Sequence, residues 1–201
     1  MSKQLIERLD AHQRRHMKMM GQTYADGNSY YRRIRDQRPA DAVEVAARFI
    51  YLNKTCFNGL YRVNKAGNFN VPEGTYTNPN ICAPERLRDC SAALQKARIR
   101  LGDFKDIVPQ KGDVIYGDPP YDGCFDKYQK NGFDMADQKR LLVAASRWSA
   151  AGAKVILSNA DTRAMRELYR GWTIHDARAP RTIGQRVDSR KKAAELVITN
   201  A

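Results

Sequence analysis

From residue 98 to the C-terminus, short apolar runs alternate with segments whose apolar residues recur at helical spacing. Strands are expected at 98–102, 114–116, 154–157, 172–177 and 195–199, and helices at 134–151 and 161–169. Asp134 and Asp161 stand where a side chain caps the first turn of each helix. This alternation predicts an α/β fold with a mostly parallel, doubly wound sheet.

Three segments come directly after predicted strands: Asp103-Phe104, Asp118-Pro119-Pro120-Tyr121 and Ser158-Asn159. In open α/β sheets, ligands bind beyond the carboxyl ends of the strands. We therefore expect these three segments to lie on one rim of the sheet.

The Asp118-Pro119-Pro120-Tyr121 segment has an unusual hydrogen-bonding character. Its two prolines set a rigid turn and carry no N–H, so the backbone there offers carbonyl acceptors only. Asp118 adds a carboxylate acceptor, and Tyr121 adds a flat face for stacking. The segment suits a planar group that bears an –NH₂, such as adenine with its N6 amine. A strand-end turn with a packed tyrosine is the alternative, and the four residues by themselves do not decide between the two.

The first half of the chain has a different pattern. Helices are expected at 3–20, 41–53 and 84–98, the second capped by Asp41, with a loop at 21–39. Runs at 60–63 and 68–71 flank a short loop containing Gly67, which predicts a β-hairpin. We therefore divide the chain into residues 1–97, a helical and hairpin region, and residues 98–201, an α/β region.

Charge and composition narrow the class of function. The 201 residues carry 35 Lys and Arg against 22 Asp and Glu, a net charge of +13 that predicts a polyanionic partner such as nucleic acid. No apolar run is long enough to span a membrane, and no secretory signal is visible. Four cysteines without a C-x-x-C pattern indicate reduced thiols in the cytoplasm. His12 and His16 are spaced as helical metal ligands are, but no third ligand lies nearby, so we predict no metal site.

Several blocks together resemble the Dam-type (D12 class) DNA adenine-N6 methyltransferases. They are Phe57-Asn-Gly-Leu-Tyr-Arg-Val-Asn-Lys-Ala-Gly-Asn-Phe-Asn-Val-Pro72, Tyr116-Gly-Asp-Pro-Pro-Tyr121, Ser158-Asn-Ala-Asp161, and a tail with Arg181-Thr-Ile and Glu195-Leu. They occur in the family's order and with similar spacing. The resemblance implies a Rossmann-like methyltransferase fold that uses S-adenosylmethionine and acts on double-stranded DNA in a bacterial or phage-infected cytoplasm. Residues 1–97 would then be the target-recognition region, and residues 98–201 the C-terminal part of the catalytic domain.

The resemblance also implies roles for individual residues. Asp118, Pro119 and Pro120 would hold the target amine, and Tyr121 would stack on the flipped adenine. Asp103 and Phe104 would surround the adenine of the cofactor, with Asp118 also near the cofactor.

In the hairpin, Arg62 matches the position that reads a guanine, which agrees with the bidentate fit of arginine to O6 and N7. Phe57, Asn58 and Leu60 match positions near the flipped or adjacent bases, and Pro72 matches an apolar contact in the groove. For Phe57 and Leu60, simple burial under the hairpin is the competing interpretation. The family's usual target, GATC, is the expected recognition sequence.

The sequence departs from the family in one respect. The family's Phe-x-Gly-x-Gly turn, which lets the cofactor approach the backbone, is absent, and no G-x-G occurs among the 201 residues. We therefore expect an N-terminally incomplete fold in which the strand at 114–116 has an open edge. The chain alone is expected to bind S-adenosylmethionine weakly. Three explanations stay open: a split enzyme in which a second polypeptide supplies the missing segment, a truncated remnant, or an incomplete gene model.

Other functions remain open at this point. A non-catalytic, sequence-specific DNA-binding remnant would keep the hairpin and the positive charge but not the chemistry. Methyl transfer to RNA or to a protein amide would use the same acceptor turn, although the hairpin argues against it. A basic RNA-binding protein would explain the charge and leave the Asp-Pro-Pro-Tyr segment unexplained.

Overall fold

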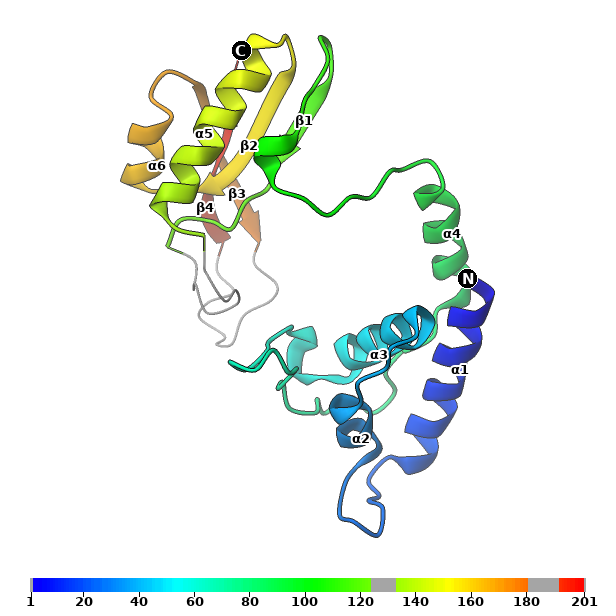
Figure 1. Ribbon diagram of the computed structural model, residues 1–201. Coiled ribbons are helices and arrows are strands. Elements are labelled where there is room, and N and C mark those ends of the chain that lie inside the picture. Colours follow the sequence, from blue (N-terminus) through cyan, green and yellow to red (C-terminus); the bar gives the residue numbers. More distant parts are fainter. Residues whose placement is uncertain (1, 124–132, 181–191, 201) are drawn as a thin grey trace. The chain divides into compact units, whose positions relative to one another are not determined.

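The computed structural model describes residues 2–123, 133–180 and 192–200 (Figure 1). Residue contacts divide the chain into two compact units, Met1–Ile99 and Arg100–Ala201, which we call unit 1 and unit 2. Each unit has its own hydrophobic core. The division falls close to the boundary between residues 97 and 98 expected from the sequence.

Unit 1 contains the helices α1 (Ser2–Met19), α2 (Tyr30–Asp36), α3 (Ala42–Thr55) and α4 (Pro84–Leu94), with a single 3-10 turn, η1 (Phe57–Gly59). The three predicted helices are confirmed, although α4 ends four residues before the predicted end at 98. The expectation of a loop throughout 21–39 is wrong, because α2 lies within it. The Ser29 side chain caps α2, and Tyr31 and Ile34 bury one face of this short helix.

The core of unit 1 joins these helices to the segment that follows α3. The Asp41 side chain accepts hydrogen bonds from the N–H groups of Val43 and Glu44, as expected of the α3 cap. The largest fully buried side chains of this unit include two tyrosines of α2 and α3. The buried residues of this core are Leu9, Tyr31, Ile34, Ala47, Tyr51, Leu52, Cys56, Phe69, Val71 and Ile81.

The predicted hairpin forms a tight turn but not two regular strands. Gly67 has a φ of +78° and donates its N–H to the Asn64 carbonyl, as the turn requires. The flanking residues make one isolated bridge, Val63 to Phe69. The Asn64 side chain accepts from the N–H groups of Ala66 and Asn68, so an asparagine side chain takes the place of part of the ladder.

Unit 2 contains η2 (Phe104–Asp106), β1 (Val114–Gly117), α5 (Met135–Ala150), β2 (Lys154–Ala160), α6 (Arg163–Leu168), β3 (Thr173–Pro180) and β4 (Lys192–Thr199). The strands form one sheet in the order β1-β2-β4-β3. Only β1 and β2 are parallel; β4 runs antiparallel to both β2 and β3. The prediction of a mostly parallel sheet is therefore wrong for the described strands. No predicted helix separates the last two strands, and consecutive strands without a crossover pair antiparallel.

Two local predictions in unit 2 also need correction. Residues 98–102 form no strand, and Leu101 is fully exposed there. Two apolar residues alternating with arginines are too little apolar surface to hold a strand against a sheet. The cap of α6 is Thr162 rather than Asp161, whose carboxylate instead pairs with Arg166. Asp134 caps α5 as predicted.

The sheet of unit 2 has two different faces. The helices α5 and α6 both pack on the face that carries Val155, Leu157, Leu196 and Ile198, which we call the helix face (Figure 1). Successive strand residues alternate between faces, so Tyr116, Ser158 and the residues aligned with them lie on the other, open face. Among the described strands β1 pairs only with β2, and its Val114 and Tyr116 are 64% and 65% exposed, which agrees with the open edge expected there. No helix in the described part of the chain is long and apolar enough to cross a membrane.

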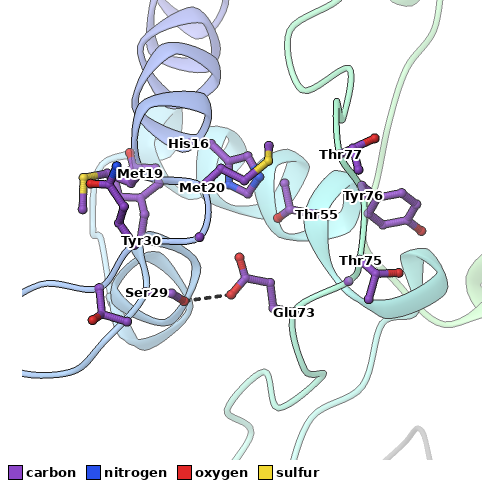
Figure 2. Close-up of a pocket in the computed structure, with 14 residues that line it drawn as sticks. His16, Met19, Met20, Ser29, Tyr30, Thr55, Glu73, Thr75, Tyr76 and Thr77 are labelled. Atoms are coloured by element: carbon purple, nitrogen blue, oxygen red, sulfur yellow. Dashed lines mark hydrogen bonds between the residues drawn. The ribbon is translucent and has the colours of Figure 1, made fainter.

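Unit 1 also has a pocket of about 410 Å³ between the end of α1, the 20–30 segment and residues 73–77 (Figure 2). Glu73 lies in the middle of it and accepts a hydrogen bond from Ser29 Oγ at 2.8 Å. His16 lines the same pocket and its Nδ1 is 2.9 Å from the Tyr51 hydroxyl. His16, the buried histidine of α1, therefore forms part of the pocket wall.

The two histidines of α1 make the stability of unit 1 depend on pH. His12 Nδ1 lies 2.8 Å from the Tyr30 hydroxyl, in the same aromatic cluster as His16. Burial lowers the pKa of both histidines below the ordinary value. Nearby carboxylates, Glu44 at His12 and Glu73 at His16, oppose that lowering without reversing it, and Arg8 adds to it at His12.

We predict that unit 1 loses stability as the pH falls below about 6.5, because the unfolded chain then binds protons that the folded unit does not. The free energy of unfolding should fall as the pH is lowered from about 7.5 through the ordinary histidine pKa of about 6.5. Urea unfolding followed by far-UV circular dichroism measures this change. Both tryptophans, Trp148 and Trp172, belong to unit 2, so tryptophan fluorescence follows that unit separately.

His16→Gln should make the pH dependence of unit 1 shallower, whatever it does to the absolute stability. His175→Gln, at an exposed position of β3, is the matched control. An identical pH slope in wild type and His16→Gln would contradict the assignment.

Candidate active site and nucleic-acid interface

The Asp118–Tyr121 segment leaves β1 and turns over the carboxyl end of the neighbouring β2. On the open face, Ser158 Oγ donates to Asp118 Oδ1 at 2.6 Å. The Tyr116 hydroxyl lies 3.3 Å from the same Ser158 oxygen. Ser158 is buried at 7% exposure, whereas Asp118 is exposed, so a buried hydroxyl fixes one carboxylate oxygen at the protein surface.

On the helix face a second set of contacts holds the same turn. Gln138 of α5 donates from Nε2 to the Pro120 carbonyl at 3.0 Å, and its Oε1 accepts from Asn159 Nδ2 at 3.1 Å. Asn159 Oδ1 accepts from the N–H of Asp122 at 2.9 Å. Gln138 and Asn159 are each only 1% exposed. Neighbouring residues of β2, 158 and 159, thus grip the turn from opposite faces of the sheet.

These contacts determine which acceptors of the turn remain available. The Pro120 carbonyl is occupied by Gln138, whereas the Pro119 carbonyl has no hydrogen-bond partner among the described residues. Asp118 keeps its second oxygen, Oδ2, outside the bond to Ser158. The turn therefore offers one carboxylate oxygen and one carbonyl as acceptors.

Tyr121 stands half-buried at the end of the turn, with its hydroxyl 3.5 Å from Glu195 Oε2. Burial raises the pKa of Tyr121, with the Glu195 and Asp118 charges acting in the same direction. The phenol therefore stays protonated at neutral pH and is held as a hydrogen-bond donor.

Asp103 and Phe104 lie at η2, beside the first turns of α5. Asp103 Oδ1 accepts from the N–H of Lys105, and its Oδ2 accepts from Arg140 Nη2 at 2.6 Å. Both bonds lower the pKa of Asp103, the backbone bond more than the arginine. The Phe104 ring packs on the core, with the Arg140 guanidinium 5.1 Å from its centroid and Phe133 at its edge.

The structure brings together two of the three segments expected on one rim. Asp118–Tyr121 and Ser158-Asn159 are joined by hydrogen bonds, although 158 and 159 lie inside β2 rather than beyond its end. Asp103-Phe104 has no recorded contact with the turn in the described chain, and the two share only their attachment to α5. Sequence analysis did not identify Gln138 as a site residue. Its position three residues before Leu141 places a polar side chain on the buried face of the helix, and this unusual placement could have indicated it.

The hairpin residues of unit 1 are arranged around η1. Asn58 has a φ of +53°, a left-handed conformation that asparagine tolerates better than most residues. Phe57 is 42% exposed, and its N–H donates to the Pro72 carbonyl at 2.9 Å. Leu60 packs against the unit 1 core, so of the two residues for which burial was the competing interpretation only Leu60 follows it.

Arg62 is held by Asn70, which lies on the other side of the Gly67 turn. Its Nε donates to Asn70 Oδ1 at 2.8 Å, and its Nη2 donates to the Asn70 carbonyl at 3.2 Å. These two hydrogen bonds use one edge of the guanidinium, and Nη1 has no hydrogen-bond partner among the described residues. The end-on edge of Arg62 is therefore oriented for a bidentate acceptor pair.

Two further expectations, on the tail segment and on metal ligands, can be compared only with the described residues. The tail segment that begins at Arg181 lies outside the described residues up to 191, whereas Glu195 and Leu196 belong to β4. In the described ranges no three His, Cys, Asp or Glu side chains gather as metal ligands do.

Comparison with known proteins shows the family of this chain. The model of the D12 class N6 adenine-specific DNA methyltransferases matches residues 1–183. The chain is 39% identical to the type II methyltransferase M1.LlaDCHI of Lactococcus lactis subsp. cremoris over 98% of its own length and 71% of the relative. It is 41% identical to the retron Ec67 DNA adenine methylase of Escherichia coli, over 76% of this chain and 54% of that protein.

A third relative, the type II methyltransferase M.MjaIII of Methanocaldococcus jannaschii, is 40% identical over 85% of this chain and 64% of its own length. The chain thus spans between about half and about seven tenths of these relatives. The family match covers both units and includes the hairpin and the Asp118–Tyr121 turn. This chain belongs to the D12 class of N6 adenine-specific DNA methyltransferases.

Proposed function

We propose that the chain transfers a methyl group from S-adenosylmethionine to the N6 amino group of adenine in double-stranded DNA. The observation that carries the proposal is the acceptor pair of the Asp118–Tyr121 turn, one carboxylate oxygen and the Pro119 carbonyl, beside the Tyr121 ring. Membership of the D12 class supports the same reaction. Cytoplasmic action on bacterial or phage DNA belongs to the proposal.

The acceptor pair acts on the electronic state of the amine. In adenine the N6 lone pair is delocalised into the ring, which makes the nitrogen a poor nucleophile. Hydrogen bonds from the two N6–H groups to Asp118 Oδ2 and the Pro119 carbonyl return electron density to the nitrogen and fix its direction. Because the base must leave the duplex, stacking on Tyr121 offsets part of an unstacking cost of roughly a few kcal/mol.

Asp103 and Phe104 are the residues that would hold the adenine of the cofactor. A carboxylate has about four lone-pair sites, and Asp103 uses two of them on Lys105 and Arg140, so it can still accept from an amine. The half-buried Phe104 ring provides an apolar surface beside it. When bound, S-adenosylmethionine supplies an electrophilic methyl group on a sulfonium sulfur.

Recognition of the DNA is assigned to unit 1. The Arg62 guanidinium, oriented by Asn70, fits the O6 and N7 acceptors of a guanine. Phe57, Asn58, Leu60 and Pro72 are proposed to contact neighbouring bases, and GATC is the proposed target. The net charge of +13 supplies attraction to phosphates that does not depend on sequence.

We predict that Asp118→Ala abolishes methyl transfer and leaves the overall affinity for DNA nearly unchanged. The rate with labelled cofactor should fall by about 100-fold or more, the scale found when one group that stabilises a transition state is removed. A second measurement compares the affinity for duplexes with adenine or with purine, which lacks the 6-amino group, at the target position. Wild type should prefer adenine, and Asp118→Ala should not.

Glu167→Ala, at an exposed position of α6, is the matched control and should change neither measurement. An unchanged adenine preference in Asp118→Ala would contradict the assigned role. If wild type itself shows no preference and no methyl transfer, the non-catalytic DNA-binding function is favoured instead.

Arg62→Ala is expected to reduce discrimination at one base pair by roughly 1–3 kcal/mol while other positions keep their preference. Lys65→Ala removes a charge from the same hairpin and should weaken binding to all sequences, lowering the salt slope by about one. Dissociation constants for duplexes with single-base changes, measured at several salt concentrations, separate the two effects. Equal losses at every base for Arg62→Ala would argue against guanine reading.

Asn70→Ala should act in the same direction as Arg62→Ala but less strongly, because the arginine remains and only its orientation is lost. The same series of duplexes measures it.

A second polypeptide that supplies a glycine-rich segment stays a prediction, and the comparisons give no support for it. Calorimetry with S-adenosylmethionine and methylation of GATC duplexes by the purified chain test it together. Micromolar cofactor binding and sustained turnover by this chain alone would contradict it.

A further inference from the structure

Unit 2 buries three polar side chains among its described residues, and all three contact the Asp118–Tyr121 turn or its neighbour Asp122. They are Gln138, Ser158 and Asn159, at 1%, 7% and 1% exposure. Ser158 contacts the proposed acceptor Asp118 directly. Gln138 and Asn159 do not; they contact Pro120 and Asp122.

An apolar residue at 138 would cost less to bury than a primary amide. Gln138 lies on the same helix face as Leu141 and Ala145, which pack into the core. A buried amide is tolerated only when its polar atoms are bonded, and here Nε2 and Oε1 both are, at 3.0 and 3.1 Å. The network therefore contributes something other than core packing.

The geometry of the hydrogen bonds made by Gln138 and Asn159 indicates their role. The turn contains two adjacent proline carbonyls, and two N–H groups of an amine need only one of them besides Asp118. Gln138 occupies the Pro120 carbonyl. Asn159 holds Gln138 through its Nδ2 and fixes the N–H of Asp122 through its Oδ1, so the turn is clamped on both sides of that carbonyl.

We propose that Gln138 and Asn159 are positioning residues that direct the adenine amine to the Pro119 carbonyl by occupying the Pro120 carbonyl and fixing the turn. They touch neither the amine nor the cofactor and act through the backbone. This inference rests on the proposed function and adds the residues that set its geometry.

Gln138→Met, of similar length, removes both hydrogen bonds and leaves the Pro120 carbonyl free. It should lower kcat by about 10- to 100-fold, the effect of misplacing a reacting group by about 1 Å, with KM for DNA within about twofold. The preference for adenine over purine at the target, a ratio of dissociation constants that needs no methyl transfer, should also shrink. Lys139→Met, exposed on the same helix, is the matched control.

Gln138→Glu provides a readout that a purely structural role would not move. An ionised glutamate can accept from Asn159 but cannot donate to Pro120, whereas a protonated one can do both. Burial, with the Asp118 and Asp122 carboxylates of the turn and Asp137 on α5, favours the protonated form, and Arg140 opposes it. The adenine preference of Gln138→Glu should therefore be weak at high pH and approach that of wild type as the pH falls.

Three outcomes are decisive, with thermal unfolding reporting whether each variant is folded. A wild-type preference for adenine that persists unchanged in Gln138→Met overturns the inference and leaves the proposed function standing. A wild type with neither such a preference nor methyl transfer overturns the proposed function itself. If Gln138→Met does not fold, Gln138→Glu decides, and a preference independent of pH in that variant overturns the inference.

Discussion

A turn built from two prolines cannot brace itself, and this constraint governs the arrangement of unit 2. Pro119 and Pro120 have no N–H to donate, so at these two positions the backbone can only accept. The donors that bond to the Asp118 carboxylate and the Pro120 carbonyl come from neighbouring elements. β2 and α5 provide them: Ser158 from the open face and Gln138 from the helix face. The burial of Gln138, Ser158 and Asn159 is thus explained by the turn and not by the core around them.

In unit 1, polar side chains likewise hold an irregular segment in place through hydrogen bonds. Its hairpin segment, residues 57–72, has one isolated bridge near its turn in place of a strand ladder, and asparagine side chains supply hydrogen bonds there instead. Asn53 donates to the Gly59 carbonyl, Asn64 closes the Gly67 turn, and Asn70 orients Arg62. Short side chains that hydrogen-bond to the nearby backbone can hold an irregular loop in one conformation. A flat ladder of regular strands would not allow such an irregular shape.

The sequence was sufficient for features with a local cause. Asp41 and Asp134 cap the predicted helices because capping depends on residues within one turn. The β1 strand and the turn after it were predicted for the same reason. The partners of that turn could not be predicted, because Gln138 lies 18 residues after Pro120 and Asn159 lies further still along the chain. No local pattern pairs residues that are so far apart in sequence. The antiparallel position of β4 between β2 and β3 is likewise a property of the whole sheet. The strand expected at 98–102 does not form, because two apolar residues among arginines offer too little surface to hold it against a sheet.

The acceptor-only character of the turn sets a limit on what it can select. It repels the carbonyl edges of thymine and guanine, which present oxygen where the turn needs N–H. Adenine N6, cytosine N4 and guanine N2 each offer two N–H groups, so hydrogen bonding of that amine at Asp118 and Pro119 does not separate these bases. The choice between these bases must come from the size of the stacked ring at Tyr121 and from the bases read beside it. That second contribution requires a donor that is fixed in direction, which is what Asn70 gives to Arg62. Under the proposed function, the chemistry of the turn therefore makes the irregular hairpin of unit 1 a necessary part of adenine specificity rather than an accessory to binding.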